Sequence, residues 1–192
     1  MPYDPNHRRR SIRLPEYDYT QPGAYFVTIC THRHACLFGD VVDSIVHLSA
    51  WGKIADQCWR DIPDHFDHVV LDEWVVMPNH IHGILLFHPI VGATHASPPQ
   101  TDVPRGPIPG SLGAVVGSFK SAVTKRVNEM RGTPGTPLWQ RNYYEHVIRN
   151  ERTLNAIRQY IADNPARWAL DRYHPNPAGR DPRAADLWRL LR

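Results

Sequence analysis

The 192-residue chain is predicted to fold as one α+β domain with ferredoxin-like, or RRM-like, topology. Three observations predict this class. The candidate elements follow the order β-α-β-β-α-β, the strand candidates are rich in β-branched and aromatic residues, and the helix candidates carry apolar residues at helical spacing. Such a fold has an antiparallel sheet with two helices on one face and with its first and third strands in the centre. A further helix is predicted after the last strand.

The first half of the chain predicts one strand, one helix and two more strands. The run AYFVTICT follows a Gln-Pro-Gly turn signal and is dominated by β-branched and aromatic residues. Leu48, Trp51 and Ala55 then share one stripe at helical spacing, and Pro63 ends that helix. A short Met-Pro-Asn turn joins the two strands that follow. The predicted elements are the strand 24–31, the helix 48–59 and the strands 68–77 and 80–87.

The second half predicts a helix, a strand and a last helix. Residues 88–110 are crowded with proline, glycine and small residues and are expected to form a long surface loop. Ser111 is placed to cap the next helix, and Asn150 to cap the last one, which stops before Pro165. The predicted elements are the helix 112–130, the strand 143–148 and the helix 151–164, with a short helix near residues 184–191.

The composition is typical of a cytoplasmic protein that could bind a polyanion. A formal net charge of +3 permits a polyanionic partner without requiring one. Three cysteines form no disulfide framework, which favours a reducing compartment. No apolar run is long enough to span a membrane and the first residues contain no apolar signal segment, so we expect a cytoplasmic chain without a membrane partner. We expect a basic arm at 1–22, a main domain at 23–170 and a C-terminal tail at 171–192.

The stretch MPNHIHGILLF holds the first of two His-x-His pairs. Residues i and i+2 of a strand share a face, so His80 and His82 should project together while Ile81 points into the core. Two neutral imidazoles in this arrangement can chelate a divalent cation. A polar strand face with two solvated histidines fits the same pattern, so the motif alone leaves both interpretations open.

The second pair lies upstream in CTHRHACLFG and is the poorer candidate. An arginine stands between His32 and His34, and on a strand it would point into the core. A zinc site made of this pair with Cys30 and Cys36 has suitable ligand types, but its spacing is not that of a usual zinc finger.

The last predicted helix offers a nucleophile and a third ligand. Tyr160 and Asn164 are four residues apart, so they lie on one face of the helix, and Asp163 is a rival for the role of ligand. A tyrosine with the usual pKa of about 10 is a poor nucleophile until its surroundings activate it. Helical tyrosines more often serve in packing.

Four segments in combination resemble a known family. They are WVVMPNHIHGILL, GSFKSAVTKRVN, LWQRNYYEHVIRN and LNAIRQYIADNPARW, and the similarity runs from about residue 25 to 168. Together they resemble the REP-associated tyrosine transposases, single-tyrosine relatives of the small HUH insertion-sequence transposases. The resemblance identifies His80-Ile81-His82 with the metal-binding motif of the family, Tyr160 with its nucleophile and Asn164 with its third ligand.

The resemblance implies a metal-dependent endonuclease and strand transferase. Such an enzyme cleaves and rejoins single-stranded DNA at REP-like hairpins through a 5′-phosphotyrosine on Tyr160. Mg²⁺ or Mn²⁺ would be held by His80, His82 and Asn164. The chain would act as a monomer or homodimer in the cytoplasm, in association with the nucleoid. The last helix must then pack on the open face of the sheet and bring Tyr160 beside the histidines.

Basic and aromatic side chains are the candidates for contacts with DNA. Cations contact phosphates, and Tyr143, Tyr144 and Trp139 could stack on bases, although a solvated charged face and core packing are the plainer interpretations. Arginines at 8–10 could also reach DNA. Two alternative functions are a catalytically silent module that binds single-stranded nucleic acid and a hydrolase that uses water as nucleophile. The candidate phosphate contacts are Lys120, Lys125, Arg126, Arg141, Arg149 and Arg152.

Overall fold

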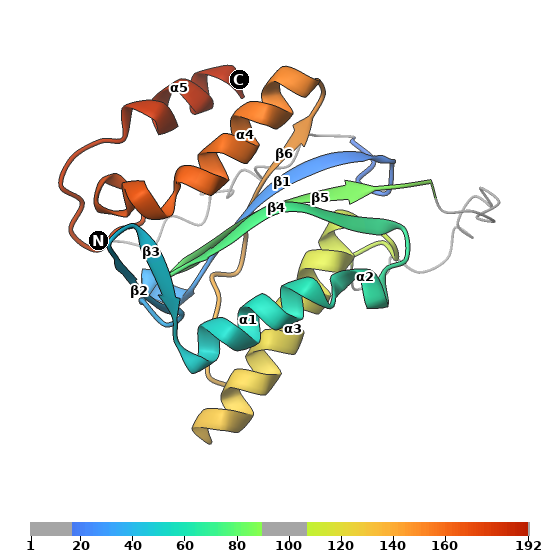
Figure 1. Cartoon of the computed structure of the whole chain (residues 1–192). Helices are drawn as coiled ribbons and strands as arrows, with labels where there is room; N and C mark the ends of the chain where they lie inside the picture. The colour runs from blue at the N-terminus through green and yellow to red at the C-terminus, as the bar shows by residue number, and fades with distance from the viewer. Residues whose placement is uncertain (1–16, 90–106, 192) are drawn as a thin grey trace, which may run out of the picture.

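A four-stranded antiparallel sheet forms the centre of the molecule (Figure 1). The computed structural model describes residues 17–89 and 107–191, so the arginines at 8–10 and most of the predicted loop at 88–110 lie outside it. The central strands are the first and third of the β-α-β-β-α-β order, which confirms the predicted α+β, ferredoxin-like class. The strands lie in the order β4 (Val69–Met77), β5 (His80–Phe87), β1 (Gly23–Cys30) and β6 (Tyr144–Ile148).

Two helices pack together against one face of this sheet (Figure 1). They are α1 (Ala50–Arg60) and α3 (Leu112–Arg131). Ser111 caps α3 as predicted, because its side chain accepts a hydrogen bond from the third backbone N–H after it. Trp59 of α1 and Phe119 of α3 meet edge to face at 5.2 Å in the main hydrophobic core.

The opposite face of the sheet is covered by the last predicted helix, α4 (Glu151–Asp163). Asn150 caps it as predicted. A second hydrophobic cluster joins Phe26 and Ile84 of the sheet to Ile157 and Ile161 of the helix, all of them buried. The helix therefore packs where the resemblance required it, on the face that holds His80 and His82.

An ion pair fixes α4 along the outer strand β4. The guanidinium of Arg158 donates two hydrogen bonds to the carboxylate of Asp72, at 2.6 and 2.8 Å. This contact lowers the pKa of Asp72. Shape and charge together thus determine how the helix lies on the sheet.

A small hairpin after the first strand was not predicted. It consists of β2 (Gly39–Val42) and β3 (Ile45–Leu48), joined by Asp43 and Ser44. Both turn residues have positive φ, 50° and 63°, as a type I′ turn requires. The usual Asn-Gly or Asp-Gly signal is missing, which explains why the hairpin was overlooked. The other elements are α2 (Ile62–His65), α5 (Pro182–Leu190) and the 3₁₀ turns η1 (His32–His34) and η2 (Pro165–Leu170).

Gly83 of β5 lies directly beneath Trp59 of α1. A Cβ at this position would overlap the indole of Trp59, which is fully buried. We expect Gly83→Ala to lower the free energy of unfolding by about 1–3 kcal/mol, because a packed core yields little to added volume. Gly117→Ala is the matched control, since a Cβ there meets nothing within 4 Å. Equal urea midpoints for the two variants would contradict this packing.

Candidate metal and tyrosine site

His80 and His82 lie side by side on the central strand β5. Both side chains are fully buried, their ring centroids are 4.5 Å apart, and Ile81 between them lies in the core on the other side of the sheet. The interpretation as two solvated histidines on an open strand face is therefore wrong. Two imidazoles have been removed from water, and their nitrogens need partners.

The neighbouring Asn79 determines the protonation of His80. The side-chain amide nitrogen of Asn79 donates to the carbonyl oxygens of His34 and Tyr173, at 3.0 and 2.6 Å. The amide oxygen is then left to accept from Nδ1 of His80, at 2.9 Å. The lone pair of His80 consequently lies on Nε2, which is buried and has no hydrogen-bond partner among the described residues.

His82 is held in a similar way from the first strand. Its Nδ1 lies 2.9 Å from the hydroxyl of Thr28, and its Nε2 lies 3.4 Å from the hydroxyl of Tyr160. Burial lowers the pKa of His82 to about 3 and holds that of His80 well below its usual range. Both rings are thus neutral, which is the form that binds metals.

Helix α4 delivers Tyr160 and Asn164 to the two histidines. Tyr160 is 7% exposed, and its ring meets Phe26 edge to face at 6.4 Å. Burial raises the pKa of its phenol, and the charge of Asp171 adds to this effect. Asn164 is buried at the end of the helix, and its Oδ1 has no hydrogen-bond partner among the described residues.

The rival ligand Asp163 points elsewhere. Its carboxylate accepts hydrogen bonds from Gln159 and Arg183, at 2.8 and 2.6 Å. The four-residue step from Tyr160 to Asn164 places both on the buried face of the helix, whereas the adjacent position is turned away from it. The geometry therefore favours Asn164 over Asp163 as a candidate metal ligand.

Asp171, which the sequence analysis assigned to the tail, also reaches the site. Its carboxylate and the ring nitrogens of His80 and His82 supply ligand atoms that all lie within 4.8 Å of one another. It is 4% exposed, accepts from the backbone N–H of Tyr173 at 2.6 Å, and lies 3.4 Å from Nδ2 of Asn164. Burial raises its pKa. A two-histidine, one-carboxylate group is a usual set of ligands for a divalent cation.

A second tyrosine, Tyr173, lies against the same histidines. Its ring centroid is 4.8 Å from that of His80 and 5.3 Å from that of His34, nearly parallel to the latter. Burial raises the pKa of its hydroxyl, which interacts with the thiol of Cys30. In the sequence, the one feature that could have indicated the position of Tyr173 is the Asn-Pro pair after α4, where the helix ends and the chain turns back over the histidines.

The upstream zinc interpretation receives no support from the described residues. Within residues 17–89 and 107–191, His80, His82 and Asp171 are the one group of three or more histidine, cysteine or carboxylate side chains placed to hold a metal. Cys30 is buried, whereas His32 and Cys36 are exposed. His34 instead packs on Tyr173.

Acid should destabilise the metal-free protein, because both histidines are buried in the neutral form. In the unfolded chain each would protonate near pH 6.5, far above the folded pKa values. Below that pH the unfolded state binds more protons, so stability is complete above pH 6.5 and falls as the pH decreases. The loss approaches about 1.4 kcal/mol per pH unit for each histidine.

Urea unfolding in EDTA at about pH 7.5 and pH 5 measures this loss. Asp171 acts in the opposite direction, because its raised pKa lets the folded state keep a proton that the unfolded state has lost. It is one group against His80, His82 and His146, whose pKa values are all lowered by burial. Equal stability at the two pH values would contradict the buried neutral histidines.

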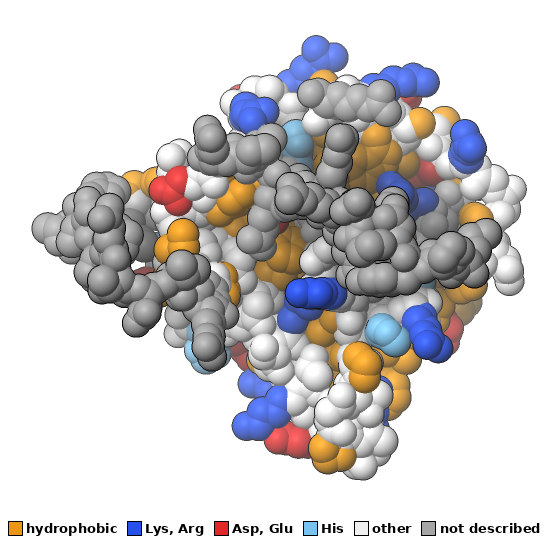
Figure 2. All heavy atoms as spheres, turned by 180° about the vertical axis from the view of Figure 1, so that it is seen from behind, with side chains coloured by type: hydrophobic (Ala, Val, Ile, Leu, Met, Phe, Trp, Pro, Cys, Tyr) orange, Lys and Arg blue, Asp and Glu red, His pale blue; other side chains and the backbone are white. Residues whose placement is uncertain are grey.

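The six residues predicted to contact phosphate lie in different parts of the structure. Lys and Arg side chains are spread over the face seen in Figure 2, with fewer acidic ones among them. Arg126 pairs with Asp61 at 3.5 Å, and Arg149 and Arg152 are exposed around the start of α4. Lys120, Lys125 and Arg141 line one cavity.

The predicted stacking residues pack within the protein. Trp139 is 7% exposed, and its Nε1 donates to the carbonyl oxygen of Lys120 at 3.1 Å. Tyr144 packs on Phe26 and Trp188, and Tyr143 is half-buried against the main core. Core packing is therefore the better description of all three aromatic residues.

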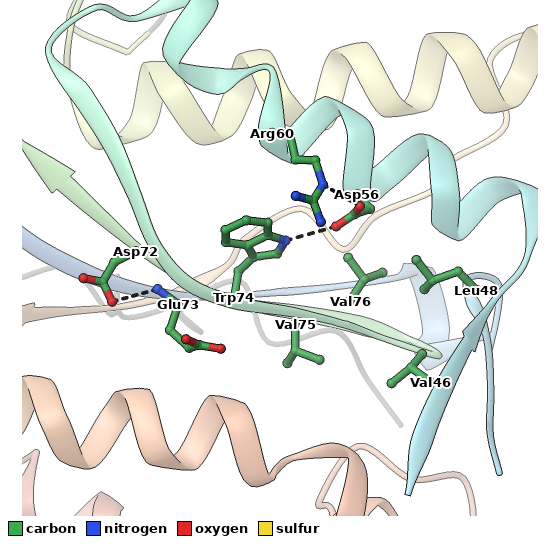
Figure 3. Close-up of a pocket in the computed structure, with 9 residues that line it drawn as sticks. All are labelled: Val46, Leu48, Asp56, Arg60, Asp72, Glu73, Trp74, Val75 and Val76. Atoms are coloured by element: carbon green, nitrogen blue, oxygen red, sulfur yellow. Dashed lines mark hydrogen bonds and ion pairs between the residues drawn. The ribbon is translucent and has the colours of Figure 1, made fainter. Parts of the chain in front are cut away.

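A cavity of about 310 Å³ at the edge of β4 has the wrong charge for a polyanion. Figure 3 shows three carboxylates in it, those of Asp56, Asp72 and Glu73, against a single cation. That cation, Arg60, lies over the ring of Trp74 at 4.8 Å and pairs with Asp56. Phosphate would be repelled here.

Fold and site define an α+β domain whose central strand presents two histidines to a tyrosine, an amide and a carboxylate. The chain belongs to the same family as an uncharacterized protein of Haemophilus influenzae, with 39% identity over 171 residues, which cover 88% of this chain and 94% of that protein. No protein-family profile matches the sequence. No helix of the described residues is long and apolar enough to cross a membrane.

Two solved structures are similar to the chain at low identity. One is a REP-associated tyrosine transposase bound to a REP hairpin, at 19% identity and a TM-score of 0.49 over 81% of this chain and 74% of that one. The other is a candidate transposase from Deinococcus radiodurans R1, at 21% identity and a TM-score of 0.41 over 78% and 94%. Both TM-scores are below 0.5, so the function has to be argued from the residues of this chain.

Proposed function

We propose that the protein is a metal-dependent HUH endonuclease and strand transferase that cleaves and rejoins single-stranded DNA through Tyr160. The observation that carries the proposal is the approach of the Tyr160 hydroxyl to Nε2 of His82, at 3.4 Å, inside a group of potential metal ligands. The candidate nucleophile and the candidate metal ligands thus share one buried site.

The residues of the site fit a divalent cation. Nε2 of His80 and Oδ1 of Asn164 are buried acceptors without partners among the described residues, which costs free energy unless a ligand satisfies them. His80, His82 and Asn164 would hold Mg²⁺ or Mn²⁺, with Asp171 as a further oxygen ligand. When bound, the cation would offset the charge of a phosphodiester and polarise its oxygen. Asn79 and Thr28 orient the imidazoles from behind.

Tyr160 supplies the nucleophile for a balanced exchange of ester bonds. Its hydroxyl oxygen forms a bond to phosphorus while the bond from phosphorus to the 3′ oxygen breaks. The phenol proton ends on the released 3′ hydroxyl, and a 5′-phosphotyrosine remains. The raised pKa of Tyr160 keeps the phenol protonated near neutral pH, so it attacks only where the surroundings stabilise the developing negative charge. Reversal with a new 3′ hydroxyl rejoins the strand without a nucleotide cofactor.

Partners and organisation follow as part of the same proposal. The substrate would be single-stranded DNA that forms REP-like hairpins, bound by the domain at 23–170 and by the basic arm at 1–22. Arg149 and Arg152, which are exposed, remain candidates for phosphate contacts at the surface, whereas Arg126 is paired with Asp61. The protein would act in the cytoplasm, in association with the nucleoid, as a monomer or homodimer.

A labelled, hairpin-bearing single strand tests the proposal. After incubation with Mn²⁺ or Mg²⁺, a denaturing gel should show a covalent protein–DNA adduct. Cleaved DNA without an adduct would favour a hydrolase that uses water. Binding without cleavage would favour the catalytically silent single-strand-binding module, and either outcome would reject the transferase.

A further inference from the structure

A basic groove lies between α3 and the segment 135–141, which leads from that helix towards β6. Its volume is about 510 Å³. We call it the α3 groove and define it by Lys120, Ser121, Thr124, Lys125, Gln140 and Arg141. Three of these side chains are cations and the others are hydrogen-bonding groups, a combination suited to phosphate.

The absence of carboxylates distinguishes the α3 groove from three other cavities of the described residues. No acidic side chain is among the described residues that line it. The cavity in Figure 3 contains three carboxylates and one arginine. The cavity between α4 and α5 contains four arginines with Asp163 and Asp186, and the cavity beside α2 contains Lys125 and Arg126 with Asp61. A polyanion would therefore meet cations without any carboxylate in the α3 groove, whereas each of the other three cavities also presents at least one carboxylate.

Lys120 holds the groove in shape from inside. Its ammonium donates to the backbone carbonyl oxygens of Gln140 and Arg141, at 2.7 and 3.1 Å, and burial lowers its pKa. These bonds fix the segment that carries Arg141 against the helix. The exposed side chains of Ser121, Lys125 and Arg141 are left to face a ligand.

One end of the groove leads to the histidine site. The backbone N–H of Gln140 donates to the carbonyl oxygen of Cys30, at 2.9 Å, and Cys30 pairs directly with His80 in the sheet. The side-chain Nε2 of Gln140 lies 2.8 Å from Nε2 of His34, whose ring stacks on Tyr173. A strand bound along Gln140 would thus lie two strand spacings of the sheet, roughly 10 Å, from His80.

We propose that the α3 groove binds the backbone phosphates of the single strand next to the bond that Tyr160 cleaves. This inference rests on the proposed function and adds to it the route of the flanking strand. The groove supplies affinity and position, because phosphate contacts carry no sequence information.

Fluorescence anisotropy with fluorescein-labelled oligo(dT) of about 20 nucleotides tests the groove without any chemistry. Every protein carries Tyr160→Phe and is measured in EDTA, so neither adduct nor metal contributes. Ser121→Glu adds a negative charge inside the groove while keeping all its cations. Ser118→Glu is the matched control, since Ser118 is an exposed serine one turn earlier on α3 and lines only the neighbouring cavity.

Ser121→Glu should weaken binding about three- to tenfold, whereas Ser118→Glu should change it less than about twofold. Arg141→Gln should reduce the slope of log K against log salt by about 0.7, the value for one phosphate contact on a single strand. Arg126→Gln, on the same helix but paired with Asp61, should leave the slope unchanged.

Equal effects of the two glutamates, or equal salt slopes for the two arginine variants, would overturn the proposal. The outcome is independent of catalysis. If Ser121→Glu binds like Ser118→Glu while the protein with Tyr160 intact forms the adduct, only the groove is rejected. If Ser121→Glu selectively weakens binding while the protein with Tyr160 intact forms no adduct, only the transferase is rejected.

Discussion

Replacing Tyr160 with phenylalanine should abolish the covalent protein–DNA adduct while leaving binding of single-stranded DNA within about twofold. The substitution removes one oxygen atom, and the ring retains its contacts with Phe26 and Trp188. No other hydroxyl of the described residues bonds Nε2 of His82. Since the hydroxyl oxygen is the atom that attacks phosphorus, its loss removes the reaction and not the site.

Tyr173→Phe is the matched control for this prediction. Tyr173 is half-buried against the histidines, and its hydroxyl interacts with the thiol of Cys30 and not with His82. Adduct formation should therefore survive in this variant. If the adduct persisted in Tyr160→Phe and disappeared in Tyr173→Phe, the nucleophile would be Tyr173 and not Tyr160.

Replacing His80 with glutamine should lower the affinity for Mn²⁺ by more than about 100-fold. His80 offers a neutral Nε2 whose lone pair is fixed by the hydrogen bond from Nδ1 to Asn79, so its removal takes away a preorganised ligand. Calorimetric titration and the Mn²⁺ electron paramagnetic resonance signal both report this without DNA. His146→Gln, a half-buried histidine on β6, should leave the affinity unchanged.

The same titration separates Asn164 from Asp171 as oxygen ligand. If the carboxylate of Asp171 binds the cation directly, Asp171→Asn should lower the affinity for Mn²⁺ more than Asn164→Ala does, because an anionic oxygen is the stronger ligand. The reverse order would make Asp171 a partner that only orients the amide of Asn164, from 3.4 Å. No effect of His80→Gln would contradict the metal site as a whole.

Local patterns predicted the four-stranded sheet and its helices, but not the β2–β3 hairpin, and they predicted which candidate site residues share a face. Strand periodicity predicted that His80 and His82 share a face, and helix periodicity predicted that Tyr160 and Asn164 do. Capping by Asn150 located the start of α4 correctly. These features depend on residues a few positions apart, which a single sequence reveals.

The remaining part of the site depends on long-range packing. Asp171 and Tyr173 follow an Asn-Pro break in a proline-rich segment whose periodicity indicates no element, and only the chain reversal after α4 brings them to the histidines. The role of Asn79 was hidden in the same way, because its amide bonds carbonyl groups that lie 45 and 94 residues away in the chain. Such contacts leave no local pattern.

Peptide mapping of the adduct tests the central claim most directly. The protein is incubated with a hairpin-bearing single strand and Mn²⁺, digested with trypsin and nuclease, and the modified peptide is sequenced by mass spectrometry. A 5′-linked nucleotide on Tyr160, in the peptide from Gln159 to Arg167, is the predicted result. A nucleotide on Tyr173 or on any other residue, or cleaved DNA with no modified peptide, would contradict the account.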